Sequence, residues 1–589
     1  MKQFFKMMFA SVLGVIVGVT VVVVVGVIMG IGLLTAVTAS SSSYVPKERT
    51  ILNLSLNGML REHATSNPLT SIMGDDLKVF SLSEVLDAIQ VAKENPNVAG
   101  IYLKAGSFSA GGASLLEIRK ALIDFKQSGK FIVAYADNYT QGSYFVCATA
   151  DKVFLNPQGT LGIQGLALET TFYKGILKKI GVEMQVFKVG TYKGAVEPYL
   201  LDHLSEANRE QMNAYLSSNW NVLRSGIAES RHLQPAVIDR FANEGLRFAD
   251  AEEAVKMGLV DELRYVSEVE SYLKEKVGKP DEKLRLADCA QIASLKPAQA
   301  IAKQRITVLY AEGEIMPESA DQKYNISSVI TEKMAEELIQ LKEDEDVKAV
   351  VIRVNSPGGS AYVSDQIWKQ VKALKAEKPV VVSMSDVAAS GGYYIACAAN
   401  QIVAEPNTLT GSIGVFGMFP NMTGLFDKLD LTTDVVKTHE YADLGNAARP
   451  MTTSEKALLQ GAVERNYHTF LSRCADGRNM SMEAVDAIGQ GRVWTGEQAL
   501  ANGLVDRLGD LNTAISLAAD LADITEYSVQ TVTSTKNWWD KLWDDQLGEM
   551  RIAMMQWLLG EDFTHIQLLH QVRDAQGIWA RLPFDWSVR

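Results

Sequence analysis

Cysteine and histidine are scarce, and their scarcity excludes several kinds of site. The 589 residues include four cysteines, which lie far apart without a Cys-x-x-Cys pair, so the sequence indicates neither a disulfide framework nor a zinc site. Of the seven histidines, His439 is the one nearest a candidate motif, and a Ser-His-Asp triad has no good histidine candidate. No HExxH, P-loop or Gly-x-Ser-x-Gly motif occurs. We therefore expect no metal and no other cofactor.

Basic residues are also in deficit. The chain has 57 lysines and arginines against 70 aspartates and glutamates, which gives a net charge of −13. The basic residues form no stripe along the sequence. Nucleic-acid binding depends on a concentrated positive surface. The composition therefore excludes nucleic acid as a partner.

No charged residue occurs from Met7 to Val45. The segment from Phe9 to Val37 is almost wholly apolar, which is long enough to cross a bilayer, since a membrane helix needs roughly 20 residues. A cleaved signal peptide is the alternative, because Val37-Thr38-Ala39 resembles a cleavage site, but the apolar core of such peptides spans only about 7–15 residues. Lys2 and Lys6 precede the segment and favour a cytoplasmic N-terminus. We expect an N-terminal transmembrane helix, with the bulk of the chain on the far side of the membrane.

The rest of the chain contains an internal duplication. Residues 97–103 (NVAGIYL) correspond to residues 346–352 (DVKAVVI) at an offset of 249, and Gly-Leu-Val-Asp recurs at 258–261 and 503–506. Each copy alternates short β-rich runs with helical periodicity, as at 83–93 and 331–342, which indicates an α/β fold with mostly parallel strands. We predict an anchor and linker over 1–45, repeats over 46–300 and 301–530, and an aromatic-rich tail over 531–589. The tail suits a packing or subunit-contact element, with the membrane surface as the alternative.

Ser390 lies where an apolar strand (Val380–Met384) turns into a helix, in the stretch Ala388-Ala389-Ser390-Gly391-Gly392. A helix N-terminus presents free N–H groups, so the N–H of Gly391 could stabilise an oxyanion beside a nucleophilic serine. An ordinary Ser-Gly-Gly turn is the plain alternative. The second copy of the segment decides between these interpretations.

The two repeats have lost complementary residues. At the offset of 249, Ser390 corresponds to Gln141, and Lys193 corresponds to Ala442. An ancestral single repeat that carried both residues would explain this pattern, with one site now built from Ser390 of the second repeat and Lys193 of the first. A serine nucleophile requires a base, and a lysine can act as one when burial lowers its pKa. The alternative for Lys193 alone is a solvated surface lysine.

Two glycine-containing loops complete the predicted site. Asn355-Ser356-Pro357-Gly358-Gly359 follows a strand and opens a helix, so Gly358 or Gly359 could supply the second oxyanion donor. The first repeat has Phe108 and Ser109 in place of Pro357 and Gly358. Ser412, within Thr410-Gly411-Ser412-Ile413-Gly414, could orient the lysine amine, and its counterpart Ile163 lacks the hydroxyl.

These motifs, with Tyr192-Lys193-Gly194-Ala195-Val196-Glu197-Pro198-Tyr199, resemble the long, duplicated bacterial type of the signal peptide peptidase A family. The resemblance covers both repeats and the N-terminal helix. It implies the Clp protease/crotonase-like fold and a homotetramer anchored in the bacterial inner membrane with its catalytic part on the periplasmic side. It also implies that Ser390 is the nucleophile, Lys193 the general base and Ser412 the residue that orients it, with Gly391 and Gly358 or Gly359 forming the oxyanion hole.

The sequence therefore predicts a serine endopeptidase that degrades cleaved signal peptides and other hydrophobic peptides through an acyl-enzyme. Two other functions compete with it. A crotonase-type acyl-CoA enzyme would share the glycine loops, although it would not need the lysine. A non-catalytic membrane scaffold would keep the serine and lysine as relics.

Overall fold

The computed structural model describes residues 44–63, 79–297, 302, 304–318, 329–532 and 577–581. The predicted membrane helix, Phe9–Val37, and most of the predicted tail lie outside these ranges. Within the described part of the chain, no helix combines the length and the apolar character that crossing a bilayer requires.

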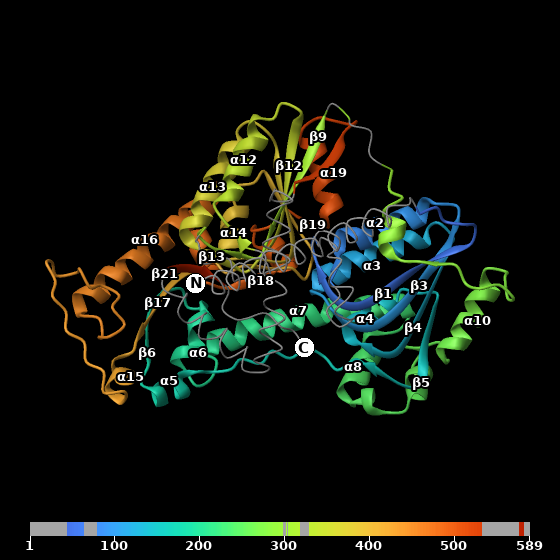
Figure 1. Ribbon diagram of the computed structural model, residues 1–589, viewed down its shortest axis with the longest axis horizontal. Helices are drawn as coiled ribbons and strands as arrows, with labels where there is room; N and C mark the ends of the chain where they lie inside the picture. Colours follow the sequence, from blue (N-terminus) through green and yellow to red (C-terminus); the bar gives the residue numbers. More distant parts are fainter. Residues whose placement is uncertain are drawn as a thin grey trace, which may run out of the picture.

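The first repeat is organised around a parallel sheet, in the order β2-β1-β3-β4-β5-β7, with β8 beside β1 (Figure 1). Apolar side chains of these strands and of helices α2, α3 and α4 form one continuous core. Strand β1 runs from Thr50 to Arg61. The strands are β1 (Thr50–Arg61), β2 (Val79–Ser81), β3 (Val98–Ser109), β4 (Phe131–Thr140), β5 (Lys152–Gly162), β7 (Glu262–Leu263) and β8 (Leu286–Ala287), and the helices are α2 (Leu82–Glu94), α3 (Gly112–Lys126), α4 (Gln141–Cys147), α8 (Pro235–Asn243), α9 (Ala251–Lys256), α10 (Val266–Lys276) and α11 (Cys289–Ala293).

The second repeat builds a corresponding sheet, in the order β18-β16-β14-β12-β9-β20, with β15 beside β14 and β19 beside β15. All of these pairs are parallel except β16 with β18. The strands are β9 (Arg305–Glu312), β12 (Val347–Ser356), β14 (Val380–Ala389), β15 (Gln401–Ala404), β16 (Leu409–Gly411), β18 (Val493–Thr495), β19 (Arg507–Leu508) and β20 (Ser528–Val532), and the helices are α12 (Lys333–Glu343), α13 (Ala361–Lys375), α14 (Gly391–Ala396), α15 (Thr423–Lys428), α16 (Thr453–Arg478), α17 (Met482–Ile488), α18 (Gly496–Ala501) and α19 (Leu511–Leu521).

The duplication extends to individual hydrogen bonds. The aspartate of each Gly-Leu-Val-Asp motif accepts a hydrogen bond at 2.7 Å from a backbone N–H, Asp261 from Val153 and Asp506 from Ile402. The β1–β3 register skips one residue at Ala99, and the β9–β12 register skips one at Lys348, its counterpart at the offset of 249. The recurring motif is therefore structural in both repeats.

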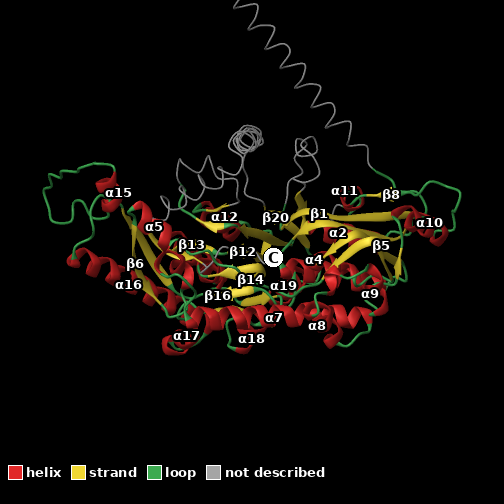
Figure 2. Ribbon diagram, turned by 90° about the horizontal axis from the view of Figure 1, so that it is seen from below, coloured by secondary structure: helices red, strands yellow, loops and turns green. Residues whose placement is uncertain are grey.

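A third sheet joins the repeats. Strand β6 (Glu183–Val189), from the first repeat, pairs antiparallel with β17 (Val415–Asn421), from the second. The sheet order is β11-β10-β13-β21-β17-β6. After β6 the chain returns through α7 (Glu206–Arg231), which runs beneath both repeats (Figure 2). The other elements of this region are β10 (Glu314–Ile315), β11 (Val329–Ile330), β13 (Gly358–Ser360), β21 (Gly577–Arg581), α5 (Lys174–Ile180) and α6 (Glu197–Leu200).

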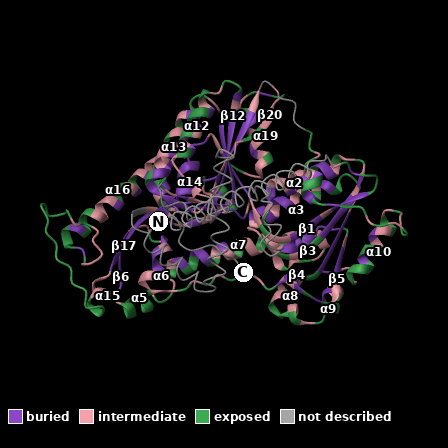
Figure 3. Cartoon of the chain, viewed as in Figure 1, coloured by how far each residue is buried: buried purple, intermediate pink, exposed green. Residues whose placement is uncertain are grey.

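Burial is deepest in the central strands of both sheets and at their junction (Figure 3). Strands buried on both faces are near-continuous apolar runs, such as the Val380–Met384 part of β14. All four cysteines are buried, and none of them forms a disulfide. The junction also buries many polar side chains.

Candidate active site

Ser390 occupies the turn between β14 and α14 in a strained conformation. Its φ of 55° and ψ of −114° are unusual for a residue with a side chain, and such strain is concentrated at functional sites. Its N–H donates to the carbonyl of Gly411 at 2.8 Å, which holds the turn against β16. In the first repeat the corresponding Gln141 is an ordinary helical residue of α4, and its side-chain oxygen accepts hydrogen bonds from Gln164 and Gly165.

Lys193 follows β6 and reaches the serine from the other repeat. Its Nζ lies 2.8 Å from Ser390 Oγ, 3.0 Å from Ser412 Oγ and 3.2 Å from the Ser412 carbonyl oxygen. All three side chains have no exposed surface. Residues that the sequence analysis assigned to one site therefore meet within a single chain.

The surroundings of Lys193 favour its neutral form. Burial lowers the pKa of Lys193 well below its usual value near 10.5, because a charged ammonium loses its hydration there. A neutral amine has two N–H donors and one lone pair. When the two hydrogens point to the carbonyl and hydroxyl oxygens of Ser412, the lone pair is left for the hydroxyl proton of Ser390. The arrangement can deprotonate a serine.

The loop Gly489–Arg492 packs against Lys193, and nothing in the sequence motifs predicted this contact. Gly491, with φ of 78°, lies so close that a Cβ on it would be 2.7 Å from both the Cβ and the backbone nitrogen of Lys193. The Gln490 carbonyl accepts from the N–H of Tyr192 at 2.9 Å, and the Arg492 carbonyl accepts from the N–H of Ser412 at 2.7 Å. The available signal was the pair of glycines in Gly489-Gln490-Gly491.

Gly358, Gly359 and Gly391 converge beside Ser390. A Cβ on Gly391 would lie 3.1 Å from both the Cα of Gly358 and the nitrogen of Gly359. Gly358 has φ of 95°, which favours glycine, and its own N–H donates to Ser356 Oγ at 3.2 Å. The N–H groups of Gly359 and Gly391 are therefore the better pair of candidate oxyanion donors.

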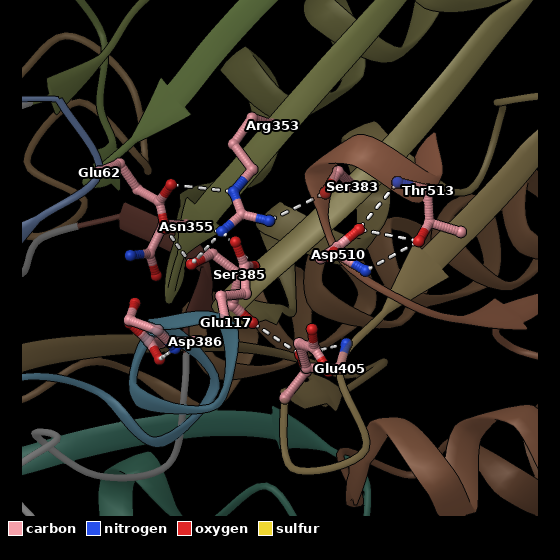
Figure 4. Close-up of polar contacts among 12 residues, drawn as sticks. Glu62, Glu117, Arg353, Asn355, Ser383, Ser385, Asp386, Glu405, Asp510 and Thr513 are labelled. Atoms are coloured by element: carbon pink, nitrogen blue, oxygen red, sulfur yellow. Dashed lines mark hydrogen bonds and ion pairs between the residues drawn. The ribbon is translucent and has the colours of Figure 1, made fainter. Parts of the chain in front are cut away.

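A buried polar network lies where the two repeats meet (Figure 4). Arg353 of β12 contacts Glu62 at 2.9 Å and Glu117 of α3 at 2.7 Å, and it donates to Ser383 at 2.9 Å. Glu405 pairs with Lys120 at 2.6 Å. The ion pairs join first-repeat to second-repeat residues, so they help to hold the two repeats together.

Asp386, four residues before Ser390, caps a helix of the other repeat. It accepts hydrogen bonds from the N–H of Ser114 at 2.9 Å and from its hydroxyl at 2.6 Å, at the start of α3. A Cβ on the N-cap residue, Gly111, would collide with this carboxylate. Burial raises the pKa of Asp386. Among the described residues, no three histidine, cysteine, aspartate or glutamate side chains gather as a metal site.

A strained serine beside a buried lysine, on an α/β fold with glycine loops at the strand ends, defines the class of hydrolases that use a Ser-Lys pair. The model of peptidase family S49 matches residues 124–279 and again 372–525, once in each repeat. The Clp protease model matches residues 302–409. The chain belongs to peptidase family S49 and is a serine protease with a duplicated, Clp-protease-like α/β fold.

Curated relatives of this chain carry protease names over most of its length. It is 34% identical to Protease 4 of Salmonella typhi over 526 residues, which cover 86% of this chain and 84% of the relative. It is 31% identical to the chloroplastic serine protease SPPA of Arabidopsis thaliana, over 91% of this chain and 78% of the relative. Protease 4 of Haemophilus influenzae is 33% identical, with 85% of each chain covered. These matches favour the protease over the acyl-CoA enzyme and the scaffold.

Proposed function

We propose that Ser390 is the nucleophile and Lys193 the general base of this serine protease. The observation that carries the proposal is the 2.8 Å separation of Lys193 Nζ from Ser390 Oγ, with both side chains fully buried. A hydrogen-bonded nucleophile and base is the arrangement that activates a serine.

The reaction follows from the positions of these groups. The Lys193 amine accepts the Ser390 proton as Oγ attacks the peptide carbonyl, and the N–H groups of Gly391 and Gly359 stabilise the oxyanion. The resulting ammonium protonates the leaving amine, and an acyl-enzyme remains on Ser390. Water then attacks the ester while Lys193 again acts as base. Ser412 keeps the amine oriented through its hydroxyl and carbonyl oxygens.

The proposal extends to substrate and location. The motif resemblance supports cleaved signal peptides and other apolar peptides as substrates, and a homotetramer as the assembly. The uncharged segment before residue 46 supports attachment to the bacterial inner membrane through an N-terminal helix, with the catalytic part in the periplasm.

Three alanine variants of the full-length protein, purified in detergent, test the catalytic roles with casein and a synthetic signal peptide. We expect S390A and K193A to lose activity by about 1,000-fold or more, because neither partner works without the other. S412A should lose about 10- to 100-fold, since the lysine keeps the Ser412 carbonyl as a partner.

S271A is the matched control. Ser271 is an exposed serine of α10 in a Ser-x-x-Lys sequence far from the dyad, and its removal should leave hydrolysis unchanged. Full activity in folded S390A or K193A would refute the assignment.

A further inference from the structure

A buried glutamine of helix α7 bridges the segment around Lys193 and a strand of the second repeat. Gln211 has almost no exposed surface. Its side-chain N–H donates to the Tyr192 carbonyl at 2.9 Å, and its side-chain oxygen accepts from the N–H of Val493, in β18, at 3.0 Å. One amide therefore connects the two repeats close to the site.

The donor side of this amide leads to the base. Tyr192 directly precedes Lys193 in the chain, and Gly194 directly follows it. Helix α7 also packs against Gly194, because a Cβ on this glycine would collide with the side chain of Asn208. Asn208 lies one turn before Gln211 and accepts a hydrogen bond from it. The first turns of α7 therefore hold the backbone on both sides of Lys193.

The acceptor side of the amide leads to the two serines. Val493 lies opposite Gly411 in the antiparallel pair of β16 and β18. The Gly411 carbonyl accepts from the N–H of Ser390, and Ser412 follows Gly411 in the chain. A displacement of Val493 would therefore be passed on to the segment that holds Ser390 and Ser412.

The second repeat provides an internal comparison for this glutamine. Its helix α16 corresponds to α7, since both have 26 residues and their N-caps, Ser205 and Thr452, are 247 positions apart. At this offset Gln211 corresponds to Leu458, which is 48% exposed. The second repeat also has Ala442 in place of the lysine. The buried glutamine is therefore present in the repeat that supplies the base and absent from the other.

We propose that Gln211 is a positioning residue that sets the separation between Lys193 and Ser390. The proposal rests on the proposed roles of these two residues. Gln211 acts through its hydrogen bonds to Tyr192 and Val493. An apolar side chain in its place would take this partner from a buried carbonyl and a buried N–H, so both segments would shift to find others. A shift of about 1 Å at a reacting group can reduce a rate about 100-fold.

Two variants of the full-length protein, purified in detergent, test this role with the synthetic signal peptide. Q211L keeps the length of the side chain without its hydrogen bonds, whereas Q211A leaves room for a water molecule in place of the amide. We expect kcat to fall about 10- to 100-fold in Q211L and about tenfold in Q211A, with KM within about twofold of the wild type. Q90L, which replaces an exposed glutamine of α2, is the matched control and should keep the wild-type kcat.

The acylation of Ser390 by p-nitrophenyl acetate is the second readout. Ser390 Oγ takes the acetyl group, p-nitrophenolate leaves, and Lys193 takes the serine proton, so the burst of nitrophenolate reports the activation of the serine without a peptide. We expect this burst to slow by about the same factor as kcat. A merely structural role would lower the melting temperature but leave kcat and the burst of the folded protein unchanged.

The remaining outcomes overturn the proposal in distinguishable ways. Folded Q211L or Q211A with kcat and burst rate within twofold of the wild type removes the positioning role and leaves the protease assignment intact. If Q211L does not fold, Q211A decides alone. A higher KM with an unchanged burst makes Gln211 part of the peptide-binding surface instead. A burst that persists in S390A refutes the proposed function itself.

Discussion

At the scale of single residues, Lys193 is unusual because it is fully buried and yet no described carboxylate forms an ion pair with it. Its amine contacts the hydroxyls of Ser390 and Ser412 and the Ser412 carbonyl. Burying an ammonium among neutral partners costs free energy, so the amine favours its deprotonated, neutral form instead. In the proposed mechanism, the same burial that would destabilise a structural lysine lets this one act as the base.

The pH dependence of hydrolysis should follow this amine. The pKa of Lys193 is lowered by burial, and the active form is the neutral amine. We therefore expect kcat/KM to be full above the pKa of Lys193 and to fall as the pH drops through it, with a midpoint well below 10.5. Steady-state kinetics from pH 5 to pH 10, with thermal melts to exclude unfolding, would measure that midpoint.

The variant K193R tests whether catalysis requires a neutral amine at this position. A guanidinium has a pKa above about 12 and cannot become neutral, so the variant should lose about 1,000-fold or more at every pH. An active K193R, or a rate that rises as the pH falls, would show that Lys193 is not the base.

The dyad could be predicted from the sequence because the duplication provides an internal comparison. The change from serine to Gln141 in one repeat and from lysine to Ala442 in the other assigns both residues. The same comparison gives no such signal for Gly491, since glycine is common in turns. Its role depends on a close approach to Lys193 that only the folded chain shows.

At the scale of elements, the site depends on the loop Gly489–Arg492 as much as on the strands. This loop accepts hydrogen bonds from the N–H of Tyr192, next to Lys193, and from the N–H of Ser412. It therefore fixes Lys193 and Ser412 relative to one another. Positioning of this kind is costly to disturb, since a displacement of about 1 Å at a reacting group can reduce a rate 100-fold.

The variant G491A tests whether the contact between Gly491 and Lys193 positions the lysine. The added Cβ would lie 2.7 Å from Lys193 and push the base away from Ser390, so we expect kcat/KM to fall by about 100-fold. G129A is the matched control: Gly129 also has a positive φ, of 76°, but nothing lies within 4 Å of its Cβ position. Both variants carry the same backbone strain, of about 1 kcal/mol. Equal, small effects on kcat/KM in the two variants would show that the close contact of Gly491 with Lys193 does not position the lysine for catalysis.

The sequence predicted several central elements, such as the strand Val380–Met384 and the helices near 83–93 and 331–342, because apolar runs and helical periodicity mark them. It did not predict the antiparallel pair of β6 and β17. The two strands are far apart in the chain, and nothing in the sequence of β6 (EMQVFKV) specifies its partner. This pair carries Lys193 to the second repeat, so the element that assembles the dyad is one that local patterns could not assign.

At the scale of the whole molecule, buried charges join the repeats. Arg353 sits between Glu62 and Glu117 with almost no exposed surface, and Glu117 leaves one carboxylate oxygen without a hydrogen-bond partner among the described residues. The duplication was visible in the sequence, but this docking was not. Glu62 and Arg353 are 291 positions apart in the sequence, and a salt bridge between residues so far apart produces no periodic sequence pattern.

One carboxyl of this cluster should hold a proton near neutral pH, and this makes the junction sensitive to alkali. Burial, which outweighs Arg353, raises the pKa of Glu117 to about 8 from an ordinary value of 4.5. Between pH 4.5 and 8 the Glu117 carboxyl is therefore protonated in the folded protein and ionised in the unfolded chain. The contribution of Glu117 to the free energy of unfolding is therefore complete below pH 4.5 and is lost as the pH rises through about 8.

The variant E117Q, which imitates the protonated carboxyl, should remove this pH dependence. The wild type should lose up to about 1.4 kcal/mol of unfolding free energy per pH unit across this window, in addition to the contributions of other groups. Urea unfolding at pH 6, 7 and 8 should therefore show a shallower decline for E117Q, which becomes the more stable protein at the alkaline end. E252Q removes a carboxylate from an exposed position of α9 and should follow the wild type. If E117Q also runs parallel to the wild type, Glu117 is charged in the folded protein and the cluster carries a net negative charge across the junction that brings Lys193 to Ser390.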